Sequence, residues 1–131
     1  MEQLNMDIKE LVASDQFARY NEIELIEVSE GFAIAKMNIK PFHLNGVGIV
    51  QGGAIYTLAD LALAAASNSH GITAVGLTSN ITYFKAETAG TLFAKAIEVS
   101  LRRSVATYQV NVTNQNDELI ASFQGTVFRK P

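Results

Sequence analysis

The chain has 131 residues and a formal net charge of −3 at pH 7, and its size and composition are those of one globular domain. The absence of any basic run argues against a nucleic-acid partner, and the absence of cysteine excludes disulfides and thiolate metal ligands. The acidic N-terminus lacks the basic and apolar regions of a signal peptide, and no repeat or linker divides the chain, so we expect a single cytoplasmic domain over residues 1–131.

The first part of the chain predicts a helix, two strands and a loop. Residues 6–20 place apolar side chains at helical spacing, with a break near Ser14. Residues 22–27 and, more clearly, 32–40 alternate between apolar and polar side chains as strands do. Residues 41–50 contain two glycines and an asparagine and are expected to form a loop. The positions expected to face the interior are Ile8, Leu11, Val12 and Phe17 in the helix and Ala33, Ala35, Met37 and Ile39 in the second strand.

The stretch from Gln51 to His70 predicts a buried helix around which the rest of the chain folds. Its apolar run is rich in alanine and leucine, which favour helix, and it is too short to span a bilayer, so we expect no membrane partner. A helix that is apolar on every side must be covered on every side. Gly71 is expected to end it. Asp60 carries the one charge in this stretch and is costly to bury unpaired, which makes it the first candidate for chemistry.

Four strands are predicted after this helix, over residues 73–84, 92–101, 105–113 and 119–128. The connections between them are short enough for hairpins: 88–90, 102–104 and 114–117. The inward-facing positions expected in the second and third of these strands are Phe93, Ile97, Val99 and Leu101, and Ala106, Tyr108, Val110 and Val112. This order of elements predicts an α+β fold in which an antiparallel sheet curves around one long central helix.

Several of these residues together resemble a known family. The carrying residues are His43 and Asn45, Gly48, the run Gln51-Gly52-Gly53, Leu58-Ala59-Asp60, and Asn80-Ile81-Thr82-Tyr83. From about Phe17 to Phe128 the chain resembles the hotdog-fold acyl-CoA thioesterases of the phenylacetate-degradation (PaaI-like) group. The resemblance implies that Asn45 and the amide of Gly52, with Gly53 beside it, bind and polarise the thioester carbonyl. Asp60 would act as general base or nucleophile, with coenzyme A as part of the substrate and no separate cofactor.

One position departs from the family pattern. The family usually has histidine before the glycine pair, whereas this chain has Gln51, which can donate a hydrogen bond but carries no charge at neutral pH. This departure favours an alternative function, a non-catalytic acyl-CoA-binding protein on the same fold, whereas the retained Asp60 argues for the enzyme. A hotdog-fold hydratase or dehydratase is the weaker third interpretation, because those enzymes use a histidine near the helix start.

The spacing of the candidate residues predicts a dimer. Asp60 lies seven residues after Gly53, which is roughly 10 Å along a helix. A carbonyl held by the Gly52 or Gly53 amide would be too far from the carboxylate on the same helix. If both act on one substrate, Asp60 must come from a neighbouring subunit. We therefore expect a homodimer with shared active sites, as the family resemblance also implies, which can associate further into a dimer of dimers, a homotetramer.

Each candidate also has a purely structural interpretation. Asp60 could be a buried carboxylate capped by a hydroxyl such as Thr57, or could face solvent at a gap in the sheet. Asn45 could be a turn residue. His43 could orient the loop and His70 could interact with the helix C-terminus, and two distant histidines without cysteine argue against a metal site.

The remaining candidates concern substrate binding. Coenzyme A carries phosphates, and cations at strand ends or turns could meet them: Lys85, Arg102, Arg103, Arg129 and Lys130. The pair Arg102-Arg103 is the first to test. Gln51 and His43 are also candidate substrate-binding residues, and the acyl group, aryl or medium-chain, is expected against Ile55, Tyr56, Leu77 and Ile81.

Overall fold

The computed structural model describes residues 2–130, with side chains from Ile8 onward. Two helices, α1 (Glu2–Ala13) and α2 (Gln16–Tyr20), precede the strands β1 (Ile23–Ser29) and β2 (Phe32–Asn38). A 3₁₀ turn, η1 (Pro41–His43), leads into the central helix α3 (Gly52–Asn68). The last four strands are β3 (Thr73–Tyr83), β4 (Thr91–Leu101), β5 (Val105–Asn114) and β6 (Leu119–Lys130).

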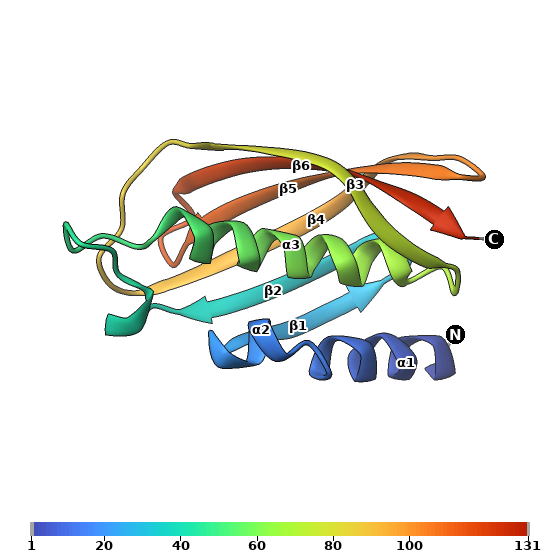
Figure 1. Cartoon of the computed structure of the whole chain (residues 1–131), viewed down its shortest axis with the longest axis horizontal. Coiled ribbons are helices and arrows are strands. Elements are labelled where there is room, and N and C mark those ends of the chain that lie inside the picture. Colours follow the sequence, from blue (N-terminus) through green and yellow to red (C-terminus); the bar gives the residue numbers. More distant parts are fainter. Residues whose placement is uncertain (1, 131) are drawn as a thin grey trace.

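One antiparallel sheet of six strands, in the order β1-β2-β4-β5-β6-β3, curves around α3 (Figure 1). Bulges or register shifts in four of the five strand pairs help the sheet to bend, because an extra residue on one strand increases the local twist. Helices α1 and α2 lie along the β1 edge of the molecule (Figure 1). The predicted α+β hotdog fold is confirmed, as is the predicted break near Ser14, which lies between α1 and α2.

The predicted hairpin between the strands now called β3 and β4 is wrong. β3 pairs with β6, while β4 pairs with β2 and β5. Helix α3 runs across the concave face of the sheet. The chain therefore leaves the helix on the side of the sheet that is away from β2 (Figure 1). The connector between β3 and β4, residues 84–90, then returns to the middle of the sheet. β3 is left as an edge strand whose second edge is unpaired in the described chain.

The predicted inward face of β4 is also wrong. Leu92, Ala94 and Ala96 are completely buried beneath α3, whereas Ile97 and Val99 are 49% and 60% exposed. The two small alanines allow α3 to approach the sheet closely. The alternation keeps the same phase along the whole strand, with residues 97, 99 and 101 exposed. Bulky apolar residues therefore mark the outer face of this strand. The predicted inward face of β5 is confirmed, since Ala106, Tyr108, Val110 and Val112 are all buried. In β2 the predicted Ala33, Ala35 and Met37 are buried, whereas Ile39 follows the strand and is only partly buried against the core.

The core lies between α3 and the sheet. Most of α3 is buried, as an all-apolar helix requires, and Gly71 with a φ of 81° follows its end as predicted. Gly125 on β6 leaves room for α3, because a Cβ there would lie 2.7 Å from Leu63 Cδ2 of the helix. In the N-terminal helices Ile8 and Val12 join this core, but Leu11 and Phe17 are 50% and 66% exposed, contrary to prediction. No helix within residues 2–130 is long and apolar enough to cross a membrane.

Candidate active site

Three clefts lie around α3, and they divide the predicted site residues between them. The cleft at the N-terminus of α3, here called the Gly52 cleft, has a volume of about 350 Å³. Its lining residues are Asn45, Ile49, Val50, Gly52, Ile55, Tyr83, Phe84, Lys85, Ala86 and Glu87. Asn45 and Gly52, the two groups expected to polarise a carbonyl, therefore share one cavity in a single chain.

The loop before α3 fixes the side chain of Asn45. Its Oδ1 accepts hydrogen bonds from the backbone N–H groups of Val47 (3.0 Å) and Ile49 (3.3 Å). These bonds give Asn45 the turn-forming role that asparagine often has. They also orient its amide, and among the main chain of residues 2–130 and the side chains from Ile8 onward no acceptor takes a hydrogen bond from its Nδ2. Asn45 thus combines the structural role with a free donor beside the cleft.

The start of α3 presents one free backbone donor. Gln51 is the N-cap, and its own Oε1 accepts the N–H of Gly53 at 3.1 Å. The carbonyl of Gln51 accepts the N–H of Ala54 at 2.9 Å. The N–H of Gly52 has no acceptor in the part of the chain whose main chain and side chains the structure describes. Because the helix macrodipole is positive at this end, the Gly52 amide is a favourable donor for a developing negative charge.

Tyr83 was not a predicted site residue, and it packs against Gly52. The Tyr83 hydroxyl donates a hydrogen bond to the Gly52 carbonyl at 2.8 Å. A Cβ on Gly52 would lie 3.0 Å from Tyr83 Oη, so a larger residue at this position would crowd the Tyr83 hydroxyl. Desolvation, and to a lesser degree the proximity of Tyr56, raises the pKa of Tyr83. The position of Tyr83 at the end of a predicted strand carried no signal for this contact.

A second cleft of about 340 Å³, the Gln51 cleft, lies on the other side of the α3 N-terminus. Its lining residues are Phe17, Asn21, Phe42, His43, Gln51, Gly53, Ala54 and Thr57. His43 is 1% exposed; its Nδ1 accepts the N–H of Lys40 (2.9 Å) and its Nε2 donates to the carbonyl of Asn21 (2.7 Å). Both ring nitrogens are engaged, which favours the structural interpretation of His43: it ties the η1 turn to the end of α2.

Asp60 lies in a third cleft of about 290 Å³, the Asp60 cleft. Its lining residues are Tyr56, Asp60, Leu63, Gly76, Leu77, Thr78 and Ser79. The Asp60 side chain is exposed in the single chain, yet protein atoms on one side desolvate it, and this raises its pKa; the charge of Asp15 adds to the effect. No hydroxyl within residues 2–130 caps it, and Thr57 instead donates to the Gly53 carbonyl at 2.7 Å.

The four predicted acyl-pocket residues do not meet in one chain. Ile55 lines the Gly52 cleft, whereas Tyr56 and Leu77 line the Asp60 cleft, where the Tyr56 hydroxyl hydrogen-bonds to Ser79 Oγ at 2.7 Å. Ile81 packs against the hydrophobic core and lines none of these three clefts.

The predicted phosphate-binding cations are also separated. Lys85 lines the Gly52 cleft and pairs with Glu87 at 2.7 Å. Arg102 and Arg103 lie in the turn between β4 and β5, at the opposite end of α3 from Gly52 (Figure 1). Arg129 is 7% exposed and donates from Nη1 to the Arg102 carbonyl at 2.6 Å.

His70, at the same end of α3 as Arg102, pairs with Glu98 at 2.7 Å. Within the described residues no group of three or more side chains could hold a metal ion.

Comparisons with known proteins identify the family of the chain. A model of the thioesterase superfamily matches residues 47–121, which include Gly52, Asp60 and β3. The chain belongs to the thioesterase superfamily. It is 43% identical over 117 residues to a putative esterase of Archaeoglobus fulgidus, covering 88% of this chain and 76% of that protein. It is 33% identical over 117 residues to the acyl-coenzyme A thioesterase PaaI of Escherichia coli, covering 88% and 84%.

Solved structures identify the same subgroup. The E. coli PaaI structure matches with a TM-score of 0.93 and 30% identity, covering 98% of this chain and 95% of that one. A Streptococcus mutans protein, solved with acetyl CoA bound, matches with a TM-score of 0.79 and 30% identity, covering 82% and 88%. The predicted resemblance to PaaI-like hotdog thioesterases is confirmed, and this member of the superfamily is a thioester hydrolase.

Proposed function

We propose that this thioesterase hydrolyses acyl-CoA thioesters with an aryl or medium-chain acyl group, releasing the free acid and coenzyme A. The observation that carries the proposal is the Gly52 cleft, in which Asn45 and Gly52 present free donors at the N-terminus of α3. The similarity to an acyl-CoA thioesterase and to a structure with acetyl CoA supports the choice of substrate. We expect no cofactor beyond the coenzyme A of the substrate, and the cytoplasmic location stays a prediction.

In the proposed mechanism the thioester carbonyl lies in the Gly52 cleft. The Gly52 N–H and Asn45 Nδ2 donate to its oxygen, and these bonds strengthen as that oxygen becomes negative in the tetrahedral intermediate. The Asp60 carboxylate either takes a proton from an attacking water, or attacks the carbonyl carbon itself and forms a mixed anhydride that water then hydrolyses to the free acid and the regenerated carboxylate. In both routes the carbon–sulfur bond of the tetrahedral intermediate breaks, and coenzyme A leaves as a thiolate that takes up a proton. Gln51 acts here as the helix cap that holds the Gly53 amide.

Asp60 is proposed to come from a second copy of the chain, and the unpaired edge of β3 supports this arrangement. The Asp60 cleft borders residues 76–79 of β3, and the Gly52 cleft borders its end at Tyr83. If two copies pair along this edge in antiparallel fashion, with a two-fold axis near Asn80, residues 76–79 of each copy lie opposite the end of β3 in the other. Asp60 of each copy would then approach the Gly52 cleft of its partner. This geometry gives two shared sites in a homodimer; further assembly into a dimer of dimers remains an expectation.

The cysteine-free chain allows a direct assay. A thiol-reactive dye reports released coenzyme A without background from the protein, so a panel of aryl and aliphatic acyl-CoAs can be compared for the wild type and Asp60→Asn. We expect turnover by the wild type and a fall of about two orders of magnitude or more in the variant, with an unchanged circular dichroism spectrum. Equal rates would remove Asp60 from the mechanism. Binding without turnover by either protein would favour the non-catalytic acyl-CoA binder, for which the glutamine at position 51 is the specific argument.

A further inference from the structure

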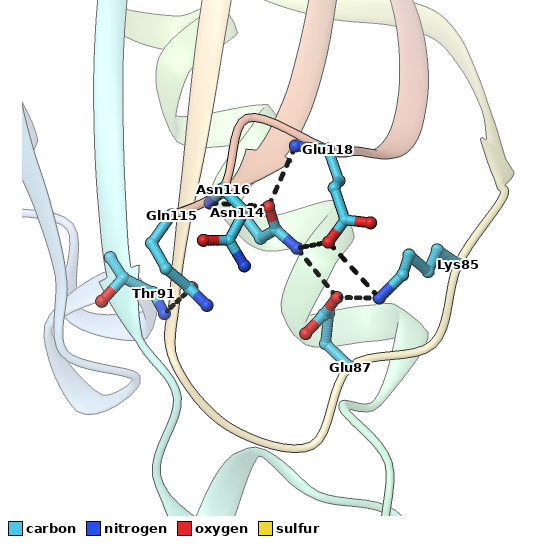
Figure 2. A network of polar contacts seen from close by, with 7 residues as sticks. All are labelled: Lys85, Glu87, Thr91, Asn114, Gln115, Asn116 and Glu118. Atoms are coloured by element: carbon cyan, nitrogen blue, oxygen red, sulfur yellow. Dashed lines mark hydrogen bonds and ion pairs between the residues drawn. The ribbon is translucent and has the colours of Figure 1, made fainter.

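Residues 84–90 connect β3 to β4. The first four of them, residues 84–87, line the Gly52 cleft, and the connector carries a polar network (Figure 2). Glu87 Oε1 accepts hydrogen bonds from Lys85 Nζ at 2.7 Å and from Asn114 Nδ2 at 3.1 Å. Asn114 comes from the end of β5, so the network joins the connector to the turn between β5 and β6. Only 11% of the Glu87 side chain is exposed.

Asn114 is a rigid anchor for Glu87. It is 4% exposed and uses both ends of its amide. Its Nδ2 also donates to Glu118 Oε1 at 2.8 Å, and its Oδ1 accepts the N–H groups of Asn116 and Glu118, each at 3.0 Å. A buried amide with all these bonds made has a fixed orientation. The Glu87 carboxylate is therefore held from the β5–β6 turn.

The main chain of Glu87 transmits this position to the candidate active site. The Glu87 carbonyl accepts the N–H of Val50 at 2.9 Å, and Val50 directly precedes the Gln51 cap of α3. Val50 is 5% exposed and lines the Gly52 cleft. A displacement of Glu87 would therefore move both the cleft wall and the residue before the helix cap.

Lys85 is occupied by carboxylates in this network. Its ammonium lies 2.7 Å from Glu87 and 3.7 Å from Glu118, so the group of three carries a net charge of −1. The Glu87 hydrogen bond raises the pKa of Lys85, and Lys85 lowers the pKa of Glu87. A phosphate approaching Lys85 would meet two carboxylates that already share its charge, which makes Lys85 a poor phosphate ligand.

We propose that Glu87 is a positioning residue that fixes the wall of the Gly52 cleft, and that Lys85 serves as its counter-ion rather than as a ligand of coenzyme A phosphates. The inference rests on the proposed function, because it takes the Gly52 cleft as the thioester site. It differs from a phosphate-binding role in a measurable way. A positioning defect affects every thioester, whereas a lost phosphate contact affects only substrates that carry phosphate.

The test compares Lys85→Met and Glu87→Gln with the matched surface variants Lys95→Met and Glu27→Gln, whose parent residues are exposed on β4 and β1. Each is assayed with an acyl-CoA and with the N-acetylcysteamine thioester of the same acid, which has no phosphate. We expect Lys85→Met and Glu87→Gln to lower kcat about tenfold on both thioesters, because small displacements at a reacting centre are costly. The surface variants should match the wild type. A Lys85→Met variant that raises KM for the acyl-CoA alone and keeps kcat would overturn the proposal.

A second measurement does not depend on activity. Amide hydrogen exchange of Val50 and of the connector should be about tenfold or more faster in Glu87→Ala than in the wild type, while amides in the middle of β5 stay protected. Unchanged exchange at Val50 would overturn the positioning role. If the wild type hydrolysed neither thioester, the proposed function would fail, and the exchange data would still decide whether Glu87 fixes the cleft wall.

Discussion

At the scale of single residues, the two glycines at the start of α3 have different environments. A Cβ on Gly52 would lie 3.0 Å from Tyr83 Oη and 3.1 Å from Tyr83 Cζ. A Cβ on Gly53 would have Gln51 Oε1, at 3.9 Å, as its nearest neighbour, which is ordinary van der Waals contact. The two adjacent positions thus form a matched pair for substitution.

We expect Gly52→Ala to lower kcat/KM about tenfold or more, because the methyl group displaces Tyr83 and alters the cleft beside the donor N–H. We expect Gly53→Ala to unfold at the same temperature as the wild type or higher, because alanine favours helix over glycine by about 1 kcal/mol. Thioester hydrolysis and thermal unfolding of both variants provide the check. Wild-type kcat/KM in Gly52→Ala would refute the close approach, and a less stable Gly53→Ala would refute the open environment.

The raised pKa of Asp60 predicts the pH dependence of the reaction. The base or nucleophile must be ionised, so kcat/KM should rise with pH through a midpoint above the ordinary pKa of aspartate. The negative charge of Asp15 contributes to that shift. Asp15→Asn removes this charge but keeps a side chain able to cap α2. The midpoint of the variant should therefore lie lower than that of the wild type. A pH profile of both proteins measures this. An identical midpoint would mean that Asp15 does not act on Asp60.

The ionised form of Asp60 that the reaction needs is unfavourable for the stability of the fold. A carboxyl group whose pKa is raised on folding binds its proton more tightly in the folded state, so its ionisation above that pKa works against folding. Asp60→Asn removes this charge. We therefore expect the variant to be no less stable than the wild type at neutral pH, which separates a loss of activity from a loss of fold.

At this scale the sequence predicted which residues gather at the α3 N-terminus but not their hydrogen bonds. Asn45 and Gly52 share a cleft as expected. The bonds of His43 to Lys40 and Asn21 depend on how η1 and α2 meet, which no local pattern encodes. The occupation of the Gly53 amide by Gln51 depends likewise on one side-chain rotamer. Glu87 lies in a connector without periodicity, so its contact with Asn114, far along the chain, left no trace in the sequence.

At the scale of elements, the β1–β2 turn is tied to the far end of α3. Gly31 has a φ of 70°, its N–H donates to Ser69 Oγ at 2.8 Å, and its carbonyl accepts the N–H of Glu98 at 3.0 Å. A Cβ there would lie 3.1 Å from Glu98 Cβ. Gly31→Ala is therefore expected to destabilise the fold by about 1–2 kcal/mol, through the left-handed backbone and the crowding.

Gly46→Ala is the control for this substitution. A Cβ on Gly46 would meet open space, with no heavy atom beyond its chain neighbours within 4 Å, and the φ of Gly46 is not positive. Alanine should therefore be neutral there or stabilise by up to about 1 kcal/mol through the unfolded chain. Urea denaturation of the two variants gives both free energies of unfolding. If the two glycines responded alike, the assigned strain at Gly31 would be incorrect.

The elements were predictable where the pattern was local. The α3 helix and the alternation of β2 and β5 followed from composition and spacing. The place of β3 did not, because hairpin-length connections give no information about a helix that carries the chain across the sheet. The inward face of β4 was misjudged because its buried positions include Ala94 and Ala96, small residues that a hydrophobicity pattern ranks below the outward Ile97 and Val99.

At the scale of the whole molecule, the β3 edge has the character of an interface. Val75, Leu77, Tyr83 and Phe84 are each between 46% and 59% exposed along this strand and the residue after it. A strand with unpaired backbone groups and large exposed apolar side chains favours pairing with another strand. Because the Asp60 and Gly52 clefts border the same strand, an interface here would complete both sites at once.

Shared sites can be tested by mixing two inactive proteins. Asp60→Asn and Asn45→Ala each damage both sites of their own homodimer. In a mixed dimer of the proposed arrangement, one site combines both defects, and the other combines the intact Asn45 of one copy with the intact Asp60 of its partner. Random exchange of subunits makes half of the dimers mixed, each with one intact site of two, so activity should return to about a quarter of the wild-type value.

The measurement is hydrolysis of an acyl-CoA after the two variants are unfolded together and refolded, with each variant treated alone as the control. A site contained in one chain would leave the mixture as inactive as its components, because every copy would lack either Asn45 or Asp60. Recovered activity would also fix which residues belong to which copy. The seven-residue separation between Gly53 and Asp60 then explains the need for a dimer: the helix that carries both groups holds them too far apart to act on the same carbonyl.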